Sequence, residues 1–484
     1  MSLLFTAMLS HSYVPQEMLI SSLVPIPKNL KKSLGSSDNY RSIAIGSILG
    51  KVLDNVFIEK HSTILQSSNL QFGFKARHST VQCSFAVQEV IEYFVQHSQQ
   101  CHVILLDASR AFDRVNYIKL FDLLRKRGLC PTTISILIQM YTTQSMHVTW
   151  AGNTSQPFQC SNGVKQGGVL SPLLFCVYMD ELIDRLRSSD IGCYIGGSFV
   201  GAFGYADDLT LLSPSVVGAR HLVAICESFA KEFDVIFNTA KSAHLIFGLE
   251  GPNGGLLLNG IAIPKVDKAQ LLGSCIGSGQ ADANFSKAIG DMTYRCNLLL
   301  ARFKFSHSST LSRLFSSFCT SFYGSPLWPL DLSCLKRLGV SWRRCLKRVW
   351  RISLLTHSVL IPLVNKCPSL HTQLLLRFAS FISSIVNSNN PIVNLLYSVA
   401  SKSMSTVALN IRLLCETLLV PSLSDFPLSK LKTTLMTISN CTVDVDNYCT
   451  AIAIHDLCAM RDQKKFHFFT REELDFLILH LCTS

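Results

Sequence analysis

Residues 203–212 read FGYADDLTLL, with two adjacent aspartates, Asp207 and Asp208, placed between apolar residues. Apolar residues on both sides of a short polar tip predict a strand, a turn and a second strand. Two neighbouring carboxylates repel each other, so a strand does not readily keep both of them ionised. A solvated turn would tolerate the pair, whereas a bound cation would use it.

A third carboxylate, Asp107, ends the short apolar run HVILL at 102–106, which has the length of a strand. If this strand neighbours the 203–212 hairpin in one sheet, three carboxylates meet at the edge of that sheet. Carboxylate oxygens without His or Cys favour Mg²⁺ over zinc, with Mn²⁺ as the alternative ion. Two such ions can bridge a triphosphate and activate a hydroxyl for in-line attack.

The rest of the chain changes character near Pro264. Before it, strand-like and helix-like stretches alternate, including a hairpin at 147–160 with its turn near Gly152 and Asn153. Helical spacing predicts helices at 117–129, at 171–189 with Ser171 as N-cap, and at 221–233. After Pro264 the chain is Ser/Leu-rich and mostly helical. This order predicts an α+β domain followed by a helical one.

The composition indicates a folded protein with an anionic partner. The 484 residues are 48% hydrophobic, and 44 Lys and Arg against 32 Asp and Glu give a net charge of +12. Such an excess without a basic tail favours a polyanion such as nucleic acid, although charge can also serve solubility alone.

The cysteines and the apolar runs bear on location. The 18 cysteines include no C-x₂-C pair, and the spacing of Cys449, His455 and Cys458 fits no zinc site. A reducing compartment is therefore expected, inside the cell in the nucleus or cytoplasm. No run of about 18 apolar residues and no basic leader is present, so we expect neither membrane binding nor secretion.

A series of blocks between about residues 20 and 280 resembles, in order, the motifs of reverse transcriptases of non-LTR (LINE-type) retrotransposons. These blocks are LVPIPKN (23–29), NYRSIAIGSILGKVLDN (39–55), QFGFKARHST (71–80), LLDASRAFDRVNY (105–117), NGVKQGGVLSPLLFCVYMDEL (162–182), FGYADDLTLL, FNTAKSAHLIF (237–247) and LLGSCIG (271–277). More loosely, residues 342–361 resemble the C-terminal part of jockey-like members.

The resemblance implies a right-hand polymerase fold, with fingers, a palm built on an antiparallel sheet and a helical thumb. We therefore expect fingers and palm at 1–265, a thumb-like region at 266–365 and a helical C-terminal extension at 366–484. It also implies an RNA-directed DNA polymerase that uses an RNA template, a DNA primer and dNTPs with Mg²⁺.

The same resemblance implies roles for individual residues. Asp107 and Asp207 would hold two metal ions, with Asp208 contributing less directly. Phe112 would be a steric gate beneath the sugar, although its place after a strand also suits core packing. The other implied roles are triphosphate contacts for Lys28 and Arg41, a nucleotide-facing turn at Gln166 and Gly167, and a proton donor to pyrophosphate at Lys241. Asp113 is expected to be structural, and Tyr205 either supports the primer end or packs.

The segment LKRLGVSWRRCLKRVWR (335–351) has helical periodicity with a single-sign basic face. That face comprises Lys336, Arg337, Arg343, Arg344, Lys347, Arg348 and Arg351. Such a helix can pack its apolar side on the protein and present cations to phosphates. A solvated amphipathic helix is the alternative.

Family members often carry an endonuclease before the fingers, and no such motif precedes Val24. We therefore expect a chain that extends a primer without cutting its own target. The alternative is a truncated, inactive relic that at most binds RNA. A group II intron maturase or a telomerase is disfavoured by the AFD block and the jockey-like segment.

Overall fold

The structure is a computed structural model that describes residues 2–249, 254–423, 426–441, 445–463 and 471–483. The chain divides into two compact units, Met1–Asp267 and Lys268–Ser484. The first unit contains both larger sheets, and the second is mainly helical, which confirms the predicted α+β class. How the second unit subdivides near residue 365 stays a prediction.

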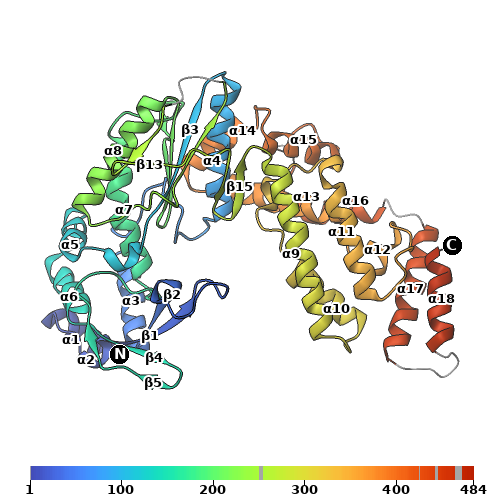
Figure 1. Cartoon of the computed structure of the whole chain (residues 1–484), viewed down its shortest axis with the longest axis horizontal. Helices are drawn as coiled ribbons and strands as arrows, with labels where there is room; N and C mark the ends of the chain where they lie inside the picture. The colour runs from blue at the N-terminus through green and yellow to red at the C-terminus, as the bar shows by residue number, and fades with distance from the viewer. Residues whose placement is uncertain (1, 250–253, 424–425, 442–444, 464–470, 484) are drawn as a thin grey trace. The chain divides into compact units, whose positions relative to one another are not determined.

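The central sheet of the first unit is antiparallel and has the strand order β11-β3-β10-β9. Its strands are β3 (Cys101–Asp107), β9 (Ala202–Tyr205), β10 (Asp208–Ser213) and β11 (Ala243–Phe247). Helices α4 (Thr80–Gln96), α7 (Ser171–Arg187) and α8 (Val216–Glu232) pack on it (Figure 1). Because β3 and β10 are buried along nearly their whole length, they appear in the sequence as continuous apolar runs. The predicted strands on either side of the aspartates are thus confirmed.

Local side chains set where these helices begin. Ser79 and Ser215 cap α4 and α8, since their side chains accept from the backbone N–H groups of Gln82 and Gly218. The cap of α7 differs from the prediction, because Ser171 is its first helical residue and Leu170 is the N-cap. Helix α8 also begins five residues before the predicted start at 221.

A second sheet has the order β2-β1-β4-β5, with β6 also paired to β4. It comprises β1 (Ile20–Pro27), β2 (Tyr40–Gly46), β4 (Ser145–Trp150), β5 (Asn153–Thr154) and β6 (Phe158–Gln159). The pairing of Trp150 with Asn153 places the turn of the predicted hairpin at 151–152, one residue earlier than expected. The unit also contains α1 (Ser2–His11), α2 (Gln16–Leu19), α3 (Ile48–Lys60), α5 (Tyr117–Lys126), α6 (Pro131–Thr142), and the short pairs β7 (Tyr194–Ile195) with β8 (Ser198–Phe199) and β12 (Leu257–Leu258) with β13 (Ile261–Ala262).

The second unit opens with the hairpin β14 (Lys268–Leu271) and β15 (Ser274–Gly277) and continues as helices. These are α9 (Gln280–Arg302), α10 (Ser308–Leu314), α11 (Leu332–Trp350), α12 (Leu360–Val364), α13 (Leu370–Val386), α14 (Pro391–Ala400), α15 (Thr406–Leu418), α16 (Leu431–Cys441), α17 (Val445–Gln463) and α18 (Arg471–Thr483). Helix α11 contacts α9, α10, α12 and α13, so its apolar side forms part of the core of this unit.

Two findings bear on the expected environment of the chain. Every cysteine whose side chain the structure describes is a free thiol. No helix within the described ranges is both long and apolar enough to cross a membrane.

A buried histidine pair joins two strands of the central sheet. His102 on β3 and His244 on β11 are 0% and 1% exposed, and His102 Nδ1 lies 3.1 Å from His244 Nε2. One ring must donate to the other, so the accepting ring is neutral in this arrangement. Burial lowers the pKa of His102, and Lys265 lowers it further. Burial, then His102, then Lys265 lower the pKa of His244 to about 4.

This pair predicts a loss of stability in mild acid. A histidine with a pKa of about 4 when folded and about 6.5 when unfolded stabilises the fold fully above pH 6.5. That contribution falls as the pH drops from 6.5 towards 4, by at most about 1.4 kcal/mol per pH unit for one group. The free energy of unfolding, measured with urea at pH 7 and pH 5, should therefore depend less on pH in His244→Gln than in the unaltered chain. An equal pH dependence in both proteins would contradict the assignment.

Candidate active site

The ends of β3 and β10 bring the three predicted aspartates together. Asp107 is the last residue of β3 and pairs directly with Asp208, the first residue of β10. Asp207 precedes Asp208 in the turn after β9. Residues opposite each other in an antiparallel ladder have Cα atoms about 4.5–5.5 Å apart. Three carboxylates therefore share one end of the sheet.

The surrounding protein and the repulsion among the three carboxylates both disfavour the ionised forms of Asp207 and Asp208. Loss of hydration, followed by the charges of Asp207 and Asp107, raises the pKa of Asp208 to about 6. Loss of hydration also raises the pKa of Asp207, with Asp107 adding to the rise while Arg41 and Lys241 oppose it.

These side chains suit a hard divalent cation in their chemistry. All three supply carboxylate oxygens, the donors that Mg²⁺ prefers, and their repulsion is what such a charge would relieve. In the part of the chain that the structure describes, however, no three His, Cys, Asp or Glu side chains are arranged as a ready-made metal site.

Lys241 lies beside Asp107. Its Nζ is 3.3 Å from Asp107 Oδ2, while its side chain stays 63% exposed. A short turn holds it there, because Asn238 donates its backbone N–H to the Asp107 carbonyl and accepts from the Lys241 N–H through Oδ1. A cation is thus fixed at the carboxylate edge by backbone contacts to the end of β3.

The two predicted finger cations differ in their surroundings. Arg41 is exposed on β2, and its charge lowers the pKa of Asp207, so it acts on the aspartate site. Lys28 is exposed as well, and its Nζ donates to the carbonyl of Asp38, 3.0 Å away. Its charge acts instead on Asp113, whose pKa is raised by burial and lowered by a hydrogen bond from Gln166 and by the charges of Arg110 and Lys28.

The glycine-containing loop before α7 lies directly against β2. The Gln166 carbonyl accepts from the Ala44 N–H at 2.6 Å, and Gln166 Nε2 donates to Asp113 Oδ1 at 3.4 Å. Gly167 has a φ of +105°, and a Cβ there would lie 2.8 Å from the Ala44 carbonyl oxygen. Only glycine fits this position without strain.

Phe112 packs its ring against Phe175 of α7 and against Phe74. Its ring stacks on Phe175 with centroids 4.5 Å apart, and its edge meets Phe74 at 5.9 Å. Its carbonyl accepts from the Val164 N–H at 2.7 Å. The ring is half-buried, so both the packing and the gate interpretations stay open.

Two side chains near the site, one buried and one half-buried, were not predicted from the sequence. Gln71, which is fully buried, bonds to both backbone groups of Ala206, the residue before Asp207. Asp54 on α3 accepts from the Leu170 N–H at 3.4 Å beneath the glycine loop, and burial raises its pKa to about 6. A glutamine inside the apolar block QFGF was the available signal for the first. No sequence signal marked Asp54.

Helix α11 presents only part of the predicted basic face to solvent. Lys336, Arg337, Arg344 and Arg348 are exposed, and Arg337 pairs with Asp282 of α9 at 3.6 Å. Lys347 does not belong to that face. It is 9% exposed, and its Nζ donates to the Leu354 carbonyl at 2.7 Å.

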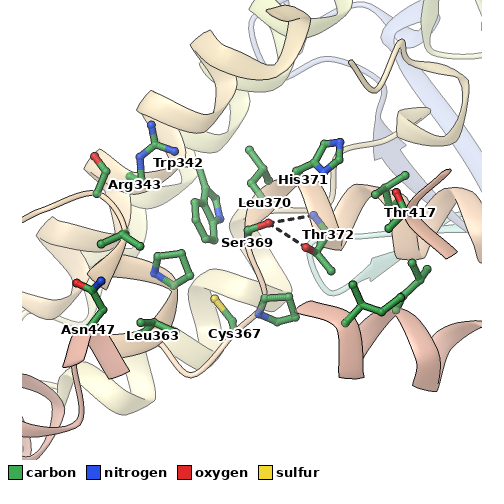
Figure 2. Close-up of a pocket in the computed structure, with 17 residues that line it drawn as sticks. Trp342, Arg343, Leu363, Cys367, Ser369, Leu370, His371, Thr372, Thr417 and Asn447 are labelled. Carbon is green, nitrogen blue, oxygen red and sulfur yellow. Dashed lines mark hydrogen bonds between the residues drawn. The ribbon is translucent and has the colours of Figure 1, made fainter. Parts of the chain in front are cut away.

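The remaining two basic residues also make contacts within the unit. Arg343 is half-buried and, with Trp342, Leu363, Ser369 and His371, lines a cavity of about 660 Å³ (Figure 2). Arg351 follows the helix and donates to the carbonyls of Lys304 and Ser306.

Comparison with known proteins identifies the region that carries this site. Residues 26–276 match the family described as reverse transcriptase (RNA-dependent DNA polymerase). A Pol polyprotein from the retrotransposable element R2DM of Drosophila melanogaster is 27% identical over 43% of this chain and 20% of its own length. The RNA-directed DNA polymerase from the mobile element jockey of the same species is 24% identical over 56% of this chain and 30% of its own.

Among solved structures, apo telomerase from Candida tropicalis covers 90% of this chain and 73% of its own, with a TM-score of 0.39 and 13% identity. A likeness at that level supports no conclusion. The chain spans less than a third of the length of either retroelement protein.

Because Gly167 lies against β2, a side chain at this position should lower the free energy of unfolding more than a side chain at an unobstructed glycine. Gly167→Ala combines a positive φ with a 2.8 Å clash against backbone, whereas Gly152→Ala, at φ +81°, meets nothing within 4 Å. Both should lower the free energy of unfolding by about 1 kcal/mol through φ alone, and Gly167→Ala by more. Urea unfolding of the two variants checks this, and equal losses would show that the loop is not held against Ala44.

Proposed function

Since the chain belongs to the reverse transcriptase (RNA-dependent DNA polymerase) family, we propose that it extends a DNA 3′-OH on an RNA template by adding dNTPs. The observation that supports this best is the direct pairing of Asp107 with Asp208, which brings three carboxylates to one end of the central sheet. The names of the R2DM and jockey relatives support a non-LTR retrotransposon origin.

The aspartates fit the role of holding two Mg²⁺ ions. Asp107 and Asp207 would hold them, and Asp208 would contribute less directly. When bound, the ions would supply positive charge that stabilises the triphosphate and favours deprotonation of the primer hydroxyl. The raised pKa of Asp208, about 6, means that this carboxylate is most available as a ligand above neutral pH.

The chain's own cations act on the triphosphate and on the pyrophosphate that leaves. Lys241, whose Nζ lies 3.3 Å from Asp107 Oδ2, would donate a proton to the departing pyrophosphate. Arg41, which already acts electrostatically on Asp207, pairs with the triphosphate, and Lys28 adds positive charge near Asp113. Each of these roles needs a cation that stays exposed, as all three are.

The loop and the ring beside it bind the rest of the nucleotide. Gly167 lets the loop lie against Ala44 of β2, and Gln166 beside it would lie along the nucleotide. Phe112, braced by Phe175, excludes a ribose 2′-OH and so selects dNTPs. Bracing matters because a gate that could rotate away would not discriminate.

The exposed cations of α11 bind the sugar–phosphate backbone of the template and primer. Lys336, Arg337, Arg344 and Arg348 lie on one exposed side, while the apolar side packs in the core of the second unit. Phosphate contacts of this kind add affinity without reading sequence.

The central test of the function is primer extension on poly(rA)/oligo(dT) with Mg²⁺. The unaltered chain should incorporate dTTP, and Asp207→Asn should lose more than about a hundredfold in rate, because it removes several kcal/mol of charge stabilisation. Asp122→Asn, at an exposed surface ion pair on α5, should retain activity. RNA binding by the unaltered chain without any incorporation would favour the inactive relic.

The proposed role of α11 predicts a change in salt dependence. Lys336→Glu with Arg344→Glu should reduce the slope of log affinity against log salt by about two, at roughly 0.9 per lost phosphate contact. Lys430→Glu with Lys432→Glu makes the same change in net charge at exposed residues elsewhere in the unit. If both pairs change template–primer binding equally, net charge rather than α11 is responsible.

A further inference from the structure

The turn that carries Asp207 is clamped from outside the sheet. Residues 70–72 lie along the edge strand β9, where Gln71 forms a parallel bridge with Gly204. The Phe72 N–H donates to the Gly204 carbonyl at 2.8 Å, and the Gly204 N–H donates to the Leu70 carbonyl at 2.9 Å. This segment thus runs alongside β9 and adds to the edge of the sheet, up to the point where the turn begins.

One side-chain amide occupies the space behind the turn. Gln71 is 0% exposed, and its Oε1 accepts from the N–H groups of Ala206 at 3.0 Å and Gly73 at 2.9 Å. Its Nε2 donates to the Ala206 carbonyl at 3.4 Å. Both backbone groups of Ala206 are therefore bonded to a single amide.

Ala206 needs such support because of its backbone conformation. Its φ is +59°, in the left-handed region, which costs a residue with a Cβ about 1–2 kcal/mol. The backbone of Ala206 directs the chain from the end of β9 into Asp207. The conformation of this one residue therefore decides where the Asp207 carboxylate is placed.

Two glycines make room for the amide. A Cβ at Gly73 would lie 2.3 Å from the Ala206 backbone nitrogen, and a Cβ at Gly204 would lie 2.9 Å from Gln71 Nε2. The clamp is close-packed, so neither its position nor its orientation can drift much.

We propose that Gln71 is a positioning residue that locks Ala206 in its left-handed conformation and so places Asp207 for divalent-metal binding. This inference rests on the proposed function. It requires one acceptor for two N–H groups and one donor for a carbonyl, which a glutamine amide supplies and neither Met nor ionised Glu does. Gln71 itself touches no substrate.

The experiment compares Mg²⁺ titrations of primer extension in Gln71→Met and Gln144→Met. Gln144 is a matched control, since it is also 0% exposed in the first unit and its Nε2 donates at 2.8 Å to Tyr117, away from the aspartates. We expect Gln71→Met to raise the Mg²⁺ concentration for half-maximal rate by about tenfold, the equivalent of one lost buried hydrogen bond. Gln144→Met should leave that Mg²⁺ concentration unchanged. The template–primer Kd should be unchanged in both variants. Equal Mg²⁺ dependence in the two variants overturns the proposal.

A rescue separates positioning from general destabilisation. Adding Ala206→Gly to Gln71→Met should restore part of the Mg²⁺ affinity, because glycine adopts a positive φ at little cost. If Gln71→Met does not fold, Gln71→Glu replaces it, because glutamate is close to glutamine in shape. An Mg²⁺ dependence of Gln71→Glu equal to that of the unaltered chain also overturns the proposal. If neither variant folds while Gln144→Met does, Gln71 is a folding residue and the positioning role is rejected.

Mn²⁺ binding, measured by electron paramagnetic resonance without substrate, keeps this test independent of catalysis. If the unaltered chain incorporates no dNTP, the proposed function fails. The clamp is then judged by whether Gln71→Met binds Mn²⁺ about tenfold more weakly than Gln144→Met.

Discussion

Repulsion among Asp107, Asp207 and Asp208 is the constraint on which the rest of the structure depends. The pairing of β3 with β10 brings the three carboxylates to one end of a buried sheet, where lost hydration raises the pKa of Asp207 and Asp208. A fold does not gain stability from such a cluster. The cluster nevertheless lies at the end of two strands, β3 and β10, that are buried along nearly their whole length.

The neighbouring features counter or exploit that repulsion. Lys241 is tied to the end of β3 through Asn238, so its cation stays next to Asp107. On the other side, the turn before Asp207 takes a left-handed residue that Gln71 holds through both of its backbone groups. Close approaches at Gly73, Gly167 and Gly204 let backbone replace side chains wherever the site is most crowded. Rigidity near the carboxylates thus comes mainly from backbone contacts and one buried amide.

The second unit shows how a basic helix divides its charges between structure and solvent. Helical periodicity predicted a single face of seven cations, but Lys347 and Arg351 bond to backbone carbonyls and Arg343 lines a cavity. Lys347 and Arg351 turn towards carbonyl oxygens outside the helix, which periodicity cannot reveal. The cations that stay exposed on the helix are Lys336, Arg337, Arg344 and Arg348, of which Arg348 also donates to Asn297 Oδ1 at 2.7 Å.

The sequence by itself determined the family and the α+β class, and it singled out the three aspartates as candidate site residues. It could do so because strand length, apolar runs and motif order can all be read directly along the chain. It also indicated Lys241, Gln166 and Gly167 through resemblance. Only the tertiary structure decided that Asp107 faces Asp208, that Gln71 and Asp54 support the site, and that Lys347 is buried. These features depend on which distant backbone groups meet a side chain, and one-dimensional spacing does not contain that information.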